Sequence, residues 1–413
     1  MSKPGDTIKP NNPKLIQIGR LSGKQPASWR DRSVSGPVAD KFFALGAAFA
    51  VLGTLIYGLY LWLVLNRVLP LEGNYATLRR AHVVVQVFLF FGLFVLGFIS
   101  QAGSKVVGAK LEFAAKPLVL LPIYVFGGIG MMFTKPWAPW IVCLTFAAYA
   151  LRMAYVCLRG CDRPIQAMLC ILGLSVLAAS PFLPLEDQRS ALLVTWGGFG
   201  SLIFAASVQF IVAFLGGNPL HRGVGTLFII LHCTSILLLL AGSTLNLIYP
   251  ALMSLLGLAI YLTATNFKGW FSSVRTNPLN LAFVSGYLWS IAAWMIVFFS
   301  NYSTPDLTLH ILATGWAAPL IFAVSSQVVA FLTSRNTLIH RKLWWFLLMA
   351  WQLVPLGRGA FHLFALPEWF SLIVAISSAA VILTWAAAIW RAEWTMLRLQ
   401  ASLQKGESLK SCG

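Results

Sequence analysis

The chain has 413 residues, of which 58% are apolar and only 10% are charged, and its mean hydropathy is +0.78. Soluble domains carry roughly 25% charged residues, so this composition excludes a soluble globular protein. The net charge of +18 does not indicate nucleic-acid binding, because the basic residues lie in tails and short loops. The six cysteines form no Cys-x-x-Cys pair, which argues against covalent haem attachment.

Apolar runs predict an all-α membrane protein with twelve transmembrane helices. We expect residues 1–37 to form a disordered basic cytoplasmic tail and residues 38–391 to form the membrane domain. Residues 392–413 are expected to form a second cytoplasmic tail. Each run has roughly 18 to 28 residues, enough to cross about 30 Å of hydrocarbon. The predicted spans are Ala39–Leu65, Ala81–Ser100, Pro117–Phe133, Pro139–Leu158, Ile165–Pro184, Ala191–Leu215, Gly223–Ser243, Ile248–Phe267, Leu279–Ser300, Leu307–Leu332, Leu343–Phe364 and Trp369–Trp390.

The distribution of basic residues favours an even number of spans. With both termini in the cytoplasm, the inner loops carry more Lys and Arg than the outer loops and outer helix ends. The inner residues are Lys105, Lys110, Lys116, Arg159, Arg163, Arg222, Lys268, Arg275, Arg335, Arg341 and Lys342. The outer residues are Arg67, Arg79, Arg80, Lys135, Arg189 and Arg358.

An internal repeat links the sixth and tenth spans. The sequence from Leu202 is LIFAASVQFIVAFL and that from Leu320 is LIFAVSSQVVAFL, so that Gln209 and Gln327 share an offset. The second span would be a third copy, although its sequence matches poorly. Repeats of four helices in a twelve-helix chain predict a pseudo-threefold bundle.

Histidine is the residue type that marks a site in these spans. All twelve Asp and Glu lie in tails, loops or helix ends, which disfavours ion-coupled transport. His82, His310 and His362 lie near the outer ends of the second, tenth and eleventh spans, and His232 lies near the middle of the seventh. An imidazole buried in lipid needs a partner.

Two neutral imidazoles on facing helices suit six-coordinate haem iron, and nearby arginines suit anionic haem propionates. The sequence therefore predicts haem b between the histidines of the second and tenth spans. The candidate cofactor-binding residues are His82, His310, His362, Arg79, Arg80 and Arg358. The candidate metal ligands are His82, His310 and His232. Copper is doubtful, because no set of imidazole or sulfur ligands has suitable spacing.

Three stretches of the chain resemble one known family. They are RRAHVVV from Arg79 with GFISQAGSKVVG from Gly97, then VQFIVAFLGGN from Val208, and HILATGW from His310 with FLTSR ending at Arg335. Over most of residues 40–370 the chain resembles the NnrS family of twelve-helix haem- and copper-containing membrane proteins. That family is linked to nitric oxide and denitrification.

The chain departs from the family pattern at several polar positions. Arg80 replaces the first His of the opening motif, and Val83 or Val84 replaces its Glu, while His82 keeps the second His. Leu332 stands where a closing His is expected, and Gln209 and Gln327 stand where the family tends to have Arg. The resemblance therefore favours haem over copper and describes a divergent member.

The resemblance also implies a fold and a role. It implies kinship with the haem–copper oxidase core subunit, in which twelve helices form three arcs and a low-spin haem lies between helices two and ten. It implies a place in the bacterial inner membrane and a role in nitric oxide handling, nitrosative stress or electron transfer. Lipids, nitric oxide and a redox partner are the expected partners. Two alternatives are a cofactor-free transporter and a membrane subunit of a larger complex, and the residues themselves assign no reaction.

Overall fold

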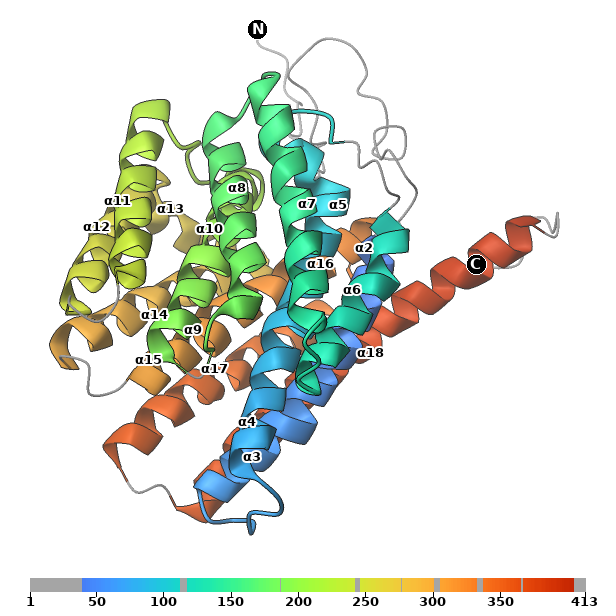
Figure 1. Ribbon diagram of the computed structural model, residues 1–413, viewed down its shortest axis with the longest axis vertical. Helices are drawn as coiled ribbons and strands as arrows, with labels where there is room; N and C mark the ends of the chain where they lie inside the picture. The colour runs from blue at the N-terminus through green and yellow to red at the C-terminus, as the bar shows by residue number, and fades with distance from the viewer. Residues whose placement is uncertain are drawn as a thin grey trace, which may run out of the picture. The chain divides into compact units, whose positions relative to one another are not determined.

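The computed structural model describes residues 39–111, 117–185, 187–241, 246–275, 277–300, 305–332, 337–364 and 367–404 (Figure 1). These residues form helices joined by turns, and no strand occurs among them, so the predicted all-α class is confirmed. The predicted tail at residues 1–37 and the last residues of the tail at 392–413 lie outside the described residues.

Several long helices combine α-helical and π-helical (η1, η2, η4, η5, η7) parts, and η3 is a short 3-10 turn. The first half consists of α2 (Ala39–Val51), η1 (Leu52–Gly58), α3 (Leu59–Leu65), α4 (Tyr75–Val84), η2 (Val85–Gly92), α5 (Leu93–Val107), α6 (Pro117–Met132), α7 (Ala138–Leu158), α8 (Pro164–Ala179), η3 (Ser180–Phe182), α9 (Gln188–Leu192), η4 (Leu193–Gly200), α10 (Ser201–Phe210) and η5 (Ile211–Leu215). The second half consists of α11 (Arg222–Leu240), α12 (Ile248–Ala264), α13 (Phe267–Val274), α14 (Leu279–Ser300), α15 (Pro305–His310), η7 (Ile311–Ala317), α16 (Ala318–Leu332), α17 (Arg341–Leu363) and α18 (Glu368–Gln404).

Each of the twelve predicted runs coincides with a helical segment, but fewer helices have the length and composition of a membrane span. Among the described residues there are nine such helices, or ten if α12 and α13, which are bent by 64°, form one span. The helix α6 has only 16 residues, and α17 carries Arg341, Lys342 and Arg358. Twelve spans therefore remain a prediction.

The backbone repeats the pattern that the sequence shows in the sixth and tenth spans. The offset that relates Gln209 to Gln327 also relates Leu193 to Ile311, the first residues of η4 and η7. In both spans a short α-helix precedes the π-helix and a longer α-helix follows it. Because π-helical turns are rare, their occurrence at the same offset is evidence for a structural repeat.

The second span has the same order of segments. Here α4, η2 and α5 follow one another, and the offset from Gln101 to Gln327 also relates Val85 to Ile311. Few side chains of this span are shared with the sixth and tenth spans. The π-helix and the glutamine are what the three spans have in common.

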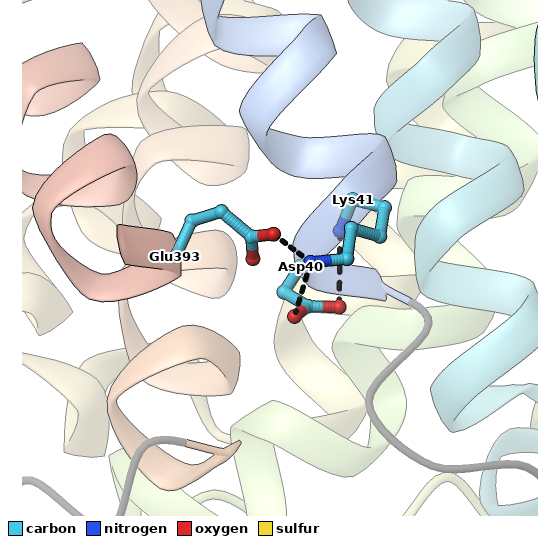
Figure 2. A network of polar contacts seen from close by, with 3 residues as sticks. All are labelled: Asp40, Lys41 and Glu393. Atoms are coloured by element: carbon cyan, nitrogen blue, oxygen red, sulfur yellow. Dashed lines mark hydrogen bonds and ion pairs between the residues drawn. The ribbon is translucent and has the colours of Figure 1, made fainter. Parts of the chain in front are cut away.

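The last two helices pack against the first. Figure 1 shows α18 in red beside α2 and α3 in blue, and α17 also contacts α18. Lys41 at the start of α2 pairs with Glu393 of α18 and lies 3.9 Å from the carboxylate of Asp40 (Figure 2). Asp40 is only 2% exposed, so this ammonium group supplies its countercharge. The helix α18 continues past Trp390 to Gln404, and its extension carries Glu393.

One glycine sets the distance between α8 and the π-helix η4. A Cβ atom at Gly173 would lie 2.7 Å from the backbone oxygen of Gly198 and 2.7 Å from Leu202. We expect Gly173→Ala to lower the stability by about 1–3 kcal/mol, because a backbone carbonyl cannot rotate away. The thermal unfolding midpoint in detergent measures the change.

Gly359 in α17 is the matched control, since a Cβ atom there would have nothing within 4 Å. We expect Gly359→Ala to leave the midpoint unchanged or to raise it, because alanine favours a helix over glycine. Equal midpoints for the two variants would contradict the close approach of α8 and η4.

Candidate functional site

Three helices that are distant in sequence bring two histidines and an arginine together. Arg358 of α17 donates a hydrogen bond to Nε2 of His310, with 2.9 Å between the nitrogens. His82 of α4 lies within electrostatic range of both residues. Asp306 begins the turn that ends at His310, and its carboxylate oxygen lies 3.4 Å from Nδ1 of that ring. We call His82, Asp306, His310 and Arg358 the His82–His310 site.

Both imidazoles are fixed by backbone carbonyls. Nδ1 of His82 lies 2.9 Å from the carbonyl oxygen of Gly53, and Nδ1 of His310 lies 2.8 Å from the carbonyl oxygen of Asp306. A carbonyl oxygen only accepts hydrogen bonds, so Nδ1 carries the hydrogen in each neutral ring. The lone pair of each ring is therefore on Nε2. Metal-ligating histidines have this arrangement, in which the second ring nitrogen donates to a carbonyl or a carboxylate.

The π-helical segments lie next to these contacts. Gly53, which accepts the hydrogen bond from His82, belongs to η1, while His310 directly precedes η7. A π-helical turn displaces carbonyls from their usual partners and leaves them open to side chains. The backbone at Gly58 also approaches His82 closely, since a Cβ atom there would lie 2.9 Å from the ring carbon Cε1. Local backbone irregularity thus positions the first imidazole.

Arg358 is held from two sides. Its guanidinium carbon lies 5.1 Å from the centre of the Trp62 ring, which is a cation–π contact. Trp62 is itself fixed, because its Nε1 donates to the carbonyl oxygen of Ser371 at 3.1 Å and its ring contacts Phe361. The carboxylate of Asp306 lies within electrostatic range of the guanidinium and balances its charge.

The other predicted site residues lie at the edge of this site. Asp306 is within electrostatic range of Arg79 and of His362, which is exposed. Arg80 is also exposed, and none of the interactions found among the described residues joins it to the four residues of the site. Arg79 and Arg80 both line a small cavity beside Leu183. The sequence prediction thus groups Arg80 with the site, whereas the structure turns it outward.

His232 belongs to a separate part of the protein. It is 1% exposed and packs among aromatic rings that include Trp196 and Phe204. Its Nε2 lies 2.8 Å from the hydroxyl oxygen of Ser201, whose hydrogen is donated to the carbonyl oxygen of Gly197. His232 therefore donates from Nε2, and its Nδ1 has no hydrogen-bond partner. Within the described part of the chain, no three His, Cys, Asp or Glu side chains form a metal-sized group.

One residue of the site, Asp306, and one neighbour of the site, Trp62, are not expected from the sequence. Asp306 is one of the helix-end carboxylates, and its position four residues before His310 places both on one helical face. Trp62 carries no sequence signal, because its contact with Arg358 depends on how α3 and α17 lie against each other. The four-residue spacing of Asp306 and His310 is thus the sequence feature from which Asp306 could have been predicted as a residue of the site.

Removing the guanidinium of Arg358 tests these contacts. We expect Arg358→Gln to lower the stability of the protein by about 1–3 kcal/mol, because the variant loses a hydrogen bond to His310 and the contact with Trp62. Thermal unfolding in detergent measures the loss. Arg80→Gln is the control and should leave the midpoint within error. A larger effect at Arg80 than at Arg358 would show that the site is assigned to the wrong arginine.

Comparison with known proteins gives the family. The sequence profile of the family described as NnrS protein matches residues 41–399, which include every residue of the His82–His310 site. A search of curated proteins finds no match to the chain. The match extends over most of the sequence, from the third residue of α2 into α18. The protein therefore belongs to the NnrS family.

Proposed function

We propose that this protein binds haem b between His82 and His310 and acts as a redox-active membrane protein in nitric oxide handling. One observation carries the proposal: two imidazoles from different spans meet near Arg358, and each is fixed through Nδ1 with its lone pair on Nε2. Neutral imidazoles with that orientation are the axial ligands of six-coordinate haem.

The surrounding side chains fit an anionic macrocycle. Arg358 now donates to Nε2 of His310, and the same guanidinium can turn to a carboxylate, which it binds more strongly than a neutral ring. Arg79 supplies a second positive charge on the same side. Trp62 and Phe361 supply flat apolar surface next to Arg358. When bound, haem supplies one-electron chemistry at a potential that its axial ligands and surroundings set.

The residues of this chain hold and tune that group. The carbonyl oxygens of Gly53 and Asp306 keep each imidazole in one tautomer and orientation and increase the basicity of Nε2. The cation–π contact with Trp62 keeps Arg358 at the site when the arginine changes its hydrogen-bond partner. Copper is not part of the proposal, since His232 lies apart with Ser201.

The proposed setting is the bacterial inner membrane, with twelve spans and both termini in the cytoplasm. Support comes from the excess of basic residues in the predicted inner loops and from the helical segments at all twelve predicted positions. The π-helical repeat in the second, sixth and tenth spans supports a pseudo-threefold arrangement like that of the haem–copper oxidase core subunit. A redox partner and nitric oxide are the proposed partners.

The absorbance spectrum of protein purified from haem-replete cells tests the proposal. We expect a Soret band that shifts on reduction with dithionite. His82→Ala and His310→Ala should each abolish or convert the low-spin spectrum, because each removes one axial imidazole. Added imidazole should restore it, since a free ligand can enter the space that the side chain leaves.

Two further variants serve as controls. His221→Ala changes an exposed histidine before α11, and His232→Ala changes the histidine bonded to Ser201. Both should keep the wild-type spectrum. Colourless wild-type protein would refute haem binding, and a spectrum that responds only to His232→Ala would move the ligand to the other histidine.

A further inference from the structure

We propose that the protein has a second binding site, a dry apolar cavity between its three repeats that takes one uncharged, apolar solute of the size of a diatomic gas. The cavity has a volume of about 80 Å³ and lies between α5, α10 and α16. It shares no residue with the His82–His310 site, so the proposal does not depend on haem.

The lining comes from equivalent positions of the three repeats. When the three repeats are aligned on Gln101, Gln209 and Gln327, two sets of lining residues occupy equivalent positions. The first set is Val95, Ile203 and Ile321, and the second is Phe98, Ala206 and Val324. All six are partly exposed and line this one cavity. A gap caused by poor packing of one helix would not be lined by the same two positions of all three repeats.

The preceding helix of each repeat also contributes. Phe43 of α2, Cys170 of α8 and Phe283 of α14 complete the wall. One turn further along, Gln209 donates from its amide nitrogen to the carbonyl oxygen of Lys105 at 2.7 Å and joins α10 to α5. The cavity is thus lined by the parts of the bundle that the repeats share.

The lining offers too few polar partners for water. Ser207 and Ser325 are its polar side chains, and Ser325 already has hydrogen-bond partners. Ser325 donates to the carbonyl oxygen of Phe322 and accepts from Nε1 of Trp385, so the Ser207 hydroxyl is the one group of the lining left to bond a water. A buried water usually needs two to four hydrogen-bond partners. The cavity is therefore expected to be dry.

Size and chemistry together define the occupant. An apolar protein cavity of about 150 Å³ binds benzene or xenon, and this cavity has about half that volume. It is too small for benzene or an acyl chain, and it excludes ions and hydrogen-bonding solutes because nothing in it would replace their hydration. One xenon atom or one apolar diatomic molecule fits these limits.

Xenon is the probe for the experiment. In crystals of the full-length protein under xenon pressure, we expect one anomalous peak between Ala206 and Val324. Ala206→Phe should abolish the peak, because the added ring fills the cavity. Ala387→Phe makes the same change on an exposed face of α18 and should keep it. Thermal unfolding of both variants shows whether they are folded.

A second variant keeps the test decisive if Ala206→Phe does not fold. Phe98→Ala enlarges the cavity, so xenon occupancy should rise and benzene should now bind. The proposal is wrong if the wild-type cavity takes no xenon under pressure or holds ordered water. It is equally wrong if an acyl chain fills the cavity or if a folded Ala206→Phe protein keeps the xenon peak.

Discussion

Two hydrogen bonds from imidazole to backbone determine the chemistry of the His82–His310 site. Each joins an Nδ1–H group to a carbonyl oxygen, at Gly53 for one ring and at Asp306 for the other. Because the carbonyls cannot donate, they leave both Nε2 lone pairs directed away from the backbone. At this site, these lone pairs and the guanidinium of Arg358 are the groups that can hold a ligand. Trp62 and Asp306 in turn hold the guanidinium.

Much of this arrangement could be predicted from the sequence. The apolar runs predicted the helical segments, because a helix that crosses a lipid bilayer needs a long stretch of apolar residues. The shared depth of His82 and His310 followed from the positions of their runs. Helix ends were harder to predict, since the run Trp369–Trp390 shows where apolar residues lie, whereas α18 continues to Gln404.

The remaining features depend on contacts between helices, which no local pattern records. The carbonyl oxygen of Gly53 can accept a hydrogen bond from His82 because the backbone is π-helical there. The amino-acid sequence around Gly53 does not predict this π-helix. Arg79 and Arg80 are neighbours with the same chemistry, yet only the first lies within range of Asp306, because adjacent helical residues point about 100° apart. The same π-helices reveal the repeat of the second span, whose side chains have diverged too far for a sequence match.

Anomalous diffraction at the iron edge, from crystals of the purified full-length protein, tests the proposed haem site most directly. We predict one iron peak within bonding distance of Nε2 of both His82 and His310, with the guanidinium of Arg358 turned toward a carboxylate of the macrocycle. An iron peak beside His232, or crystals without iron from haem-replete cells, would contradict this assignment.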